Sequence, residues 1–106
     1  MNTSSVLNKN LSDLNMALNL ASSYNNKALK NYVNNRINTI NRNHDIYEYL
    51  SPKNVVDSYV IDLQLFIKVS DVIHDIDSKD FYKSRLIDII KKFDYLKNRK
   101  DLVNLI

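Results

Sequence analysis

Apolar residues recur at helical spacing along most of this chain. Over residues 5–22 they return every three or four positions, which places them on one face of a helix. The residues concerned are Leu7, Leu11, Leu14, Leu18 and Ala21. A polar stretch then competes for backbone hydrogen bonds, and the apolar spacing resumes at Leu29. The pattern predicts one helix over about 5–22 and a second over about 26–41.

The second half of the chain begins with a helix-start signal at Ser51-Pro52. Serine is a favourable N-cap, and proline at the first helical position loses no hydrogen bond that the helix needs. We expect a helix over about 52–76 that is buried over most of its circumference, because its apolar residues form two neighbouring stripes. These are Val55, Tyr59, Phe66, Val69, Ile73 and Ile76, with Val56, Val60, Leu63 and Ile67 beside them.

A fourth helix is predicted over about 79–97, after the capping signal at Asp77-Ser78. Asn98 is expected to take the left-handed conformation that ends it, and a short turn completes the chain. No strand has comparable support, and no internal repeat of solenoid period is evident. The sequence therefore predicts a single all-α domain over residues 1–106, a small bundle of four main helices with a short C-terminal turn.

Composition excludes several kinds of site. The chain of 106 residues has no Cys and no Gly, which removes disulfides, thiol nucleophiles, cysteine metal sites and glycine-rich phosphate loops. The longest run of pure hydrophobes is three residues, so no membrane association is expected. Sixteen residues are Asn and only one is Pro, a usage that indicates an AT-rich genome. We expect a cytoplasmic protein of phage or viral origin, and the alternatives are a low-GC bacterium or a protist.

Charge is divided unevenly along the chain although the net charge is only +3. Residues 1–43 carry +4, residues 44–80 carry −5 and residues 81–106 carry +4. One interpretation is internal complementarity between an acidic third helix and its basic neighbours. The other is that an acidic edge and a basic face each steer a charged partner.

The basic flank of the fourth predicted helix is a candidate nucleic-acid surface. Four cations surround one aromatic ring there, the combination that phosphate contact and base stacking need. They are Arg85, Lys91, Lys92 and Arg99 around Tyr95. A solvated basic helix face is the simpler interpretation, and Asp88 interrupts the cluster.

Two His-Asp pairs and an acidic cluster were weighed as metal sites. His44 followed by His74-Asp75, with Asp94 or Asp101, has the residue order of some metal-dependent phosphohydrolases. Only two His exist, and a structural His74 on the buried stripe is simpler. Four acids also gather near the predicted helix start, without the glycine of a calcium loop: Asp71, Asp75, Asp77 and Asp80. We therefore expect no catalytic residue, no metal and no cofactor.

Tyrosine-rich residues provide the candidate protein interface. Tyr is favoured at interfaces because it buries a large area at low entropic cost. The patch consists of Ile46, Tyr47, Tyr49 and Leu50, with Tyr95 as a further contact. The resulting hypothesis is a non-enzymatic helical interaction module that binds or inhibits another protein, of the host or the virus. The alternatives are self-association through the 5–22 stripe and a small nucleic-acid-binding module that uses helix 79–97.

Overall fold

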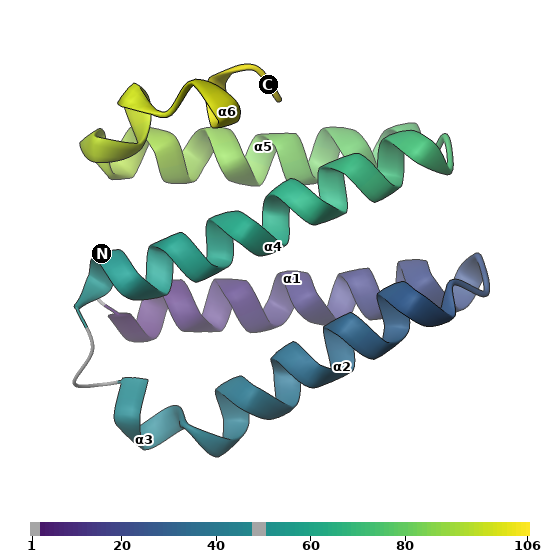
Figure 1. Cartoon of the computed structure of the whole chain (residues 1–106), viewed down its shortest axis with the longest axis horizontal. Coiled ribbons are helices and arrows are strands. Elements are labelled where there is room, and N and C mark those ends of the chain that lie inside the picture. The colour runs from purple at the N-terminus through teal and green to yellow at the C-terminus, as the bar shows by residue number, and fades with distance from the viewer. Residues whose placement is uncertain (1–2, 48–50) are drawn as a thin grey trace. The chain divides into compact units, whose positions relative to one another are not determined.

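Helices form all the regular structure in residues 3–47 and 51–106, the part of the chain that this computed structural model describes. The four long helices are α1 (Thr3–Ser23), α2 (Lys27–Arg42), α4 (Pro52–Val72) and α5 (Ile76–Lys92) (Figure 1). The short elements are α3 (His44–Tyr47), the 3-10 helix η1 (Asp94–Asn98) and α6 (Lys100–Val103). The predicted all-α fold, with four main helices and a short C-terminal turn, is confirmed.

The boundary between α4 and α5 differs from the predicted one. Helix α4 ends at Val72 rather than near residue 76, and α5 begins at Ile76 rather than at 79. The cap is Asp75, whose carboxylate oxygen accepts a hydrogen bond of 3.0 Å from the backbone N–H of Ser78. Helix α5 also ends at Lys92, and the segment predicted to continue it forms η1.

The two tight turns of the chain are built alike. Asn25 and His74 adopt left-handed conformations, with φ of 53° and 60°. The following residue donates its backbone N–H back into the last helical turn, from Asn26 to the Ala21 carbonyl at 2.8 Å and from Asp75 to the Ser70 carbonyl at 2.9 Å. This is the Schellman ending of a helix, in which glycine usually occupies the left-handed position. A chain without glycine places Asn and His there, whereas the sequence had indicated Asn98.

In both turns the next residue also starts the following helix. Asn26 is the N-cap of α2, and its side chain accepts a hydrogen bond of 3.0 Å from the Leu29 N–H. Asp75 plays the same part for α5. Each helical hairpin therefore changes direction within three residues, because one residue ends the first helix and the next begins the second.

The chain repeats one helical pattern with a spacing that the sequence alone did not reveal. Helices α1 and α4 are both 21 residues long and begin 49 residues apart, at Thr3 and Pro52. Helices α2 and α5 also begin 49 residues apart, at Lys27 and Ile76. The packing divides the chain into two units: Met1–Val55 contains the α1–α2 hairpin, and Val56–Ile106 contains the α4–α5 hairpin except for the first four residues of α4.

The same spacing relates side chains of the two hairpins, α1–α2 and α4–α5. Seven positions hold the same residue in both: Val6 and Val55, Asp13 and Asp62, Leu14 and Leu63, Lys30 and Lys79, Arg36 and Arg85, Ile40 and Ile89, Asp45 and Asp94. The aspartate pair is buried in both units, with no exposed surface at Asp13 or Asp62. Buried acids at equivalent positions belong to the framework that the two hairpins share. The expectation that the sequence contains no repeat of solenoid period stays a prediction.

Burial follows the predicted stripes with one shift. In unit 1, Leu7, Leu14 and Ala21 are buried as expected, but Leu11 and Leu18 are only half-buried. The rest of the buried face of α1 includes the polar residues Asn10 and Asp13. Most of this stripe is covered within the chain, and self-association through it stays a prediction.

In unit 2, both predicted stripes of α4 are buried as far as Ile67, and Leu63 has no exposed surface. Part of their cover is α5, since the rings of Phe66 and Tyr82 lie 5.2 Å apart. Beyond Ile67 the stripe that begins at Val55 is less well covered, and its residues Val69 and Ile73 are half-buried. The single-domain hypothesis stays a prediction.

Candidate functional site

The α4–α5 turn exposes large aliphatic side chains. Val72 is 75% exposed and Ile76 is 70% exposed, the largest values among the exposed large hydrophobic residues of the described chain. Ile73 lies between them and is half-buried. We call Val72, Ile73 and Ile76 the turn patch. Scattered exposed leucines need no explanation, but neighbouring apolar residues at one tip of a hairpin form the kind of surface that partners cover.

The sequence missed this patch because a helical wheel carries the apolar stripe straight through it. With a helix over 52–76, Ile73 and Ile76 continue the buried face. The left-handed residue His74 ends the helix first, and Ile76 becomes the first residue of α5 on the solvent side. His74 itself is exposed rather than part of the buried stripe.

Acidic side chains surround the turn patch. Asp77 and Asp80 are exposed on the first turns of α5. Asp71 accepts a hydrogen bond and ion pair of 2.6 Å from the Lys79 Nζ, and this bond is the first cause that lowers the pKa of the Asp71 carboxyl. The four acids and one base of residues 71–80 give the tip a negative charge. A protruding surface with an apolar centre and an acidic rim is complementary to an apolar pocket with a basic rim.

The predicted interface around residues 46–50 is only partly described. Ile46 belongs to α3 and is 57% exposed, as an interface residue must be. Tyr47 ends α3, and Tyr49 and Leu50 lie outside the described residues. Because two of the four patch residues lie outside the described part of the chain, that interface stays a prediction.

Tyr95 is held by a contact within its own unit. It lies in η1, partly buried, and its hydroxyl donates a hydrogen bond of 2.8 Å to the Asp57 carboxylate on α4. Burial is the first cause that raises the pKa of the Tyr95 phenol, and the hydrogen bond and charge of Asp57 raise it further. Its hydroxyl thus anchors the C-terminal segment to α4.

The four cations of the predicted nucleic-acid surface have different surroundings. Lys91 and Lys92 are exposed at the end of α5. Arg85 lies over the ring of Phe81 on the same helix, 4.9 Å from the ring centroid. Arg99 forms two hydrogen bonds to Asp101, at 2.8 and 3.3 Å, which lower the pKa of the Asp101 carboxyl. Of the four cations only the two lysines are exposed, so fewer charges of this flank are available to phosphates than its composition indicates, and the surface stays a prediction.

Histidines and acids do not converge in the described residues. His44 belongs to α3 in one unit and His74 to the α4–α5 turn in the other. Within the described ranges, no three His, Asp or Glu side chains gather as metal ligands would. Among the acids of the turn, Asp75 caps α5 and Asp71 pairs with Lys79.

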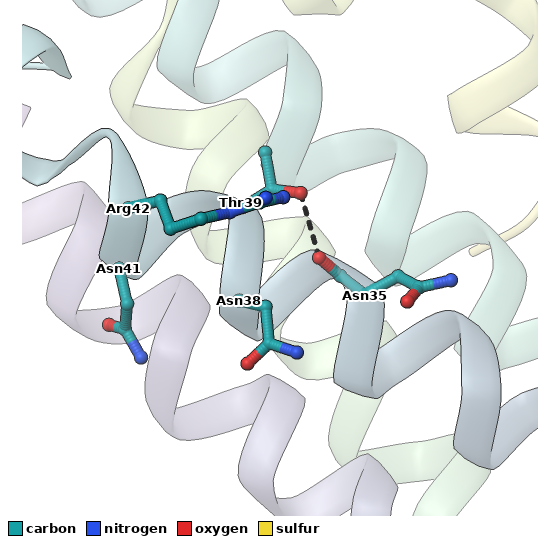
Figure 2. Close-up of a pocket in the computed structure, with 5 residues that line it drawn as sticks. All are labelled: Asn35, Asn38, Thr39, Asn41 and Arg42. Carbon is teal, nitrogen blue, oxygen red and sulfur yellow. Dashed lines mark hydrogen bonds between the residues drawn. The ribbon is translucent and has the colours of Figure 1, made fainter.

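A second surface lies on α2 and was also missed. Five polar side chains of this helix line a surface hollow, shown as sticks in Figure 2: Asn35, Asn38, Thr39, Asn41 and Arg42. Within it the Thr39 hydroxyl donates a hydrogen bond of 2.8 Å to the Asn35 carbonyl oxygen. The sequence carries a signal for this surface, because residues 27–42 include four bases and no acid, although codon usage alone also accounts for the abundance of Asn.

Comparisons with known proteins add no relative. No protein family, curated protein sequence or solved structure matches this chain. In the segments 3–47 and 51–106, no helix is both long enough and apolar enough to cross a membrane.

Proposed function

We propose that the protein is a non-enzymatic interaction module that docks onto a partner protein through the turn patch. The supporting observation is the high exposure of two aliphatic side chains at one helical turn, Val72 at 75% and Ile76 at 70%. Full burial of such side chains by a partner contributes roughly 1.5–3 kcal/mol each. The tight turn also presents them in a preformed conformation, which reduces the entropy lost on binding.

The chemistry of the turn patch indicates which kind of partner surface would bind it. Its aliphatic centre calls for an apolar pocket, and Asp77 and Asp80 call for basic residues around that pocket. In this proposal the protein covers a surface of a host or viral protein in the cytoplasm and inhibits it, in keeping with the AT-rich residue usage. Catalysis and cofactors have no part in it.

A site-specific cross-link tests the proposal. A benzophenone amino acid replaces Val72, and in a second protein it replaces Met16, an exposed residue of α1. In lysate of the native host, position 72 should yield a discrete protein adduct that position 16 does not. Excess wild-type protein should compete the adduct away, and Ile76→Asp in the probe should reduce it severalfold.

Three results would count against this proposal. They are an equal adduct pattern from both positions, an adduct that disappears after nuclease treatment, and an adduct that consists only of a second copy of this chain. Ile76→Asp places a charge on a side chain that is already mostly in water, so circular dichroism should show an unchanged helix content.

A further inference from the structure

The outward face of α2 presents a row of amides with a cation at each end. The face opposite the row is the buried one, formed by Leu29, Val33 and Ile40. All members of the row are exposed, and their spacing of four, four, three and four residues keeps them on one side of the helix. We call this row the amide ridge: Lys27, Asn31, Asn35, Asn38 and Arg42.

We propose that the amide ridge binds the major groove of double-stranded DNA. A major groove about 12 Å wide admits an α-helix, and the asparagine amide pairs with the N6 and N7 edge of adenine. Lys27 and Arg42 are 15 residues apart, which is about 22 Å along the helix. That span exceeds the groove width, so the two cations reach phosphates on its two sides while the amides between them face the base edges.

The charges of α2 favour a nucleic acid over an acidic protein. The helix has four bases and no acid among its 16 residues. Its ridge contains no apolar or aromatic side chain, whereas the centre of a protein interface is enriched in them. The hollow around Asn35, Asn38 and Arg42 is lined by polar side chains, which offer hydrogen-bond donors and acceptors (Figure 2). Such a surface recognises polar edges and phosphates.

Comparison of the two units shows that the fold does not require this ridge. The equivalent positions of α5, 49 residues later, differ in character: Ile76, Asp80, Ser84, Ile87 and Lys91. Framework residues such as Leu14 and Leu63 are retained while these outer positions diverge. The ridge is therefore a property of unit 1, and its proposed activity is independent of the turn patch.

Binding to short duplexes tests the proposal, with fluorescence anisotropy as the measurement. The full-length protein should bind a DNA duplex at least tenfold more tightly than an RNA duplex of the same sequence, because the major groove of A-form RNA is too narrow and deep for a helix. If Lys27 and Arg42 contact phosphates, log K should fall with log salt at a slope of about −2.

Two double substitutions measure the contributions of the amides and of the cations of the amide ridge separately. Asn35→Ala with Asn38→Ala should reduce the preference for A·T-rich over G·C-rich DNA about tenfold and leave the salt slope unchanged. Lys27→Gln with Arg42→Gln should weaken binding to all DNA about equally and make the slope shallower by about two. Alanine at exposed helical positions raises helix propensity, so the first pair should fold normally.

The chain supplies matched controls for both pairs. Asn8→Ala with Asn19→Ala removes two exposed amides of α1, and Lys91→Gln with Lys92→Gln removes two exposed cations of α5. Neither control should change DNA affinity more than twofold. The proposal is overturned if neither duplex binds at low salt, if polyglutamate competes as well as DNA, or if the α5 pair lowers affinity while the ridge pairs do not.

Discussion

Individual side chains attach the C-terminal segment to α4. Tyr95 in η1 donates to Asp57, and the Gln64 side-chain amide donates to Asp101 of α6 at 3.0 Å. Arg99 holds the same Asp101 through two of its nitrogens. The Tyr95 bond is the one with a large effect on titration, because its partly buried hydroxyl faces a carboxylate. Ionisation of this phenol would place two negative charges side by side.

Tyr95 is expected to titrate above the ordinary tyrosine pKa of 10.0. A pKa raised in the folded state adds stability that is fully present below pH 10 and is lost as the pH rises through the folded pKa. Asp57→Asn removes the charge of the acceptor and should lower the pKa of Tyr95 toward 10. The pH dependence of the Tyr95 ring Cζ signal in NMR measures this. An unchanged titration in the Asp57→Asn protein would show that burial alone raises the pKa.

At the scale of elements, the two turns decide where the helices end. A left-handed conformation places the side chain of an L-amino acid close to its carbonyl oxygen, at an energetic cost of roughly 1–2 kcal/mol. Asn tolerates this conformation better than most residues, and Gly avoids the clash. The local strain at Asn25 and His74 is therefore offset by the six-to-one hydrogen bonds that close each turn.

Glycine at the left-handed position should stabilise the protein. We expect His74→Gly to raise the free energy of unfolding by about 1 kcal/mol, because it relieves the strain at a residue that is otherwise exposed. His74→Val should lower it, since a branched side chain fits this conformation worst. Chemical denaturation followed by circular dichroism provides the measurement. Equal stability of the glycine and valine proteins would contradict the assigned turn.

At the scale of the molecule, one hairpin pattern occurs twice with different outer surfaces. Four of the seven agreeing pairs are buried, as Asp13 and Asp62 show, whereas the exposed residues Lys27 and Ile76 occupy equivalent positions and differ in character. Packing constrains the buried positions and leaves the exposed ones freer to diverge. The buried shared residues are therefore assigned to stability, and the divergent exposed ones to unit-specific contacts.

The equivalent leucines test whether the chain unfolds as one domain. Leu14 and Leu63 have no exposed surface, so alanine at either position should lower the free energy of unfolding by about 2–5 kcal/mol. If the single-domain hypothesis holds, each substitution shifts the whole thermal transition in calorimetry, with equal calorimetric and van't Hoff enthalpies. Two transitions, each moved by only one of the substitutions, would mean that the units unfold independently.

The sequence alone determined the helical class, the four long helices and most of the buried positions. It could do so because apolar periodicity is a local signal, readable from neighbours three and four residues away. The start at Pro52 was equally local, since proline restricts its own backbone. The common spacing of the two hairpins was not evident in the sequence, because equivalent positions share burial and capping more than residue identity, as Asn26 and Asp75 illustrate.

Tertiary structure decided the helix ends near residue 74 and, with them, which surfaces are exposed. A capping competition between Asp75 and Asp77 cannot be resolved by periodicity, because both carboxylates precede a helical pattern. Because Asp75 is the residue that caps α5, Ile76 is exposed and not buried as the longer predicted helix implies. Likewise, only the folded chain showed that Tyr95 bonds to Asp57 and Gln64 to Asp101, since residues distant in sequence meet only when the helices pack.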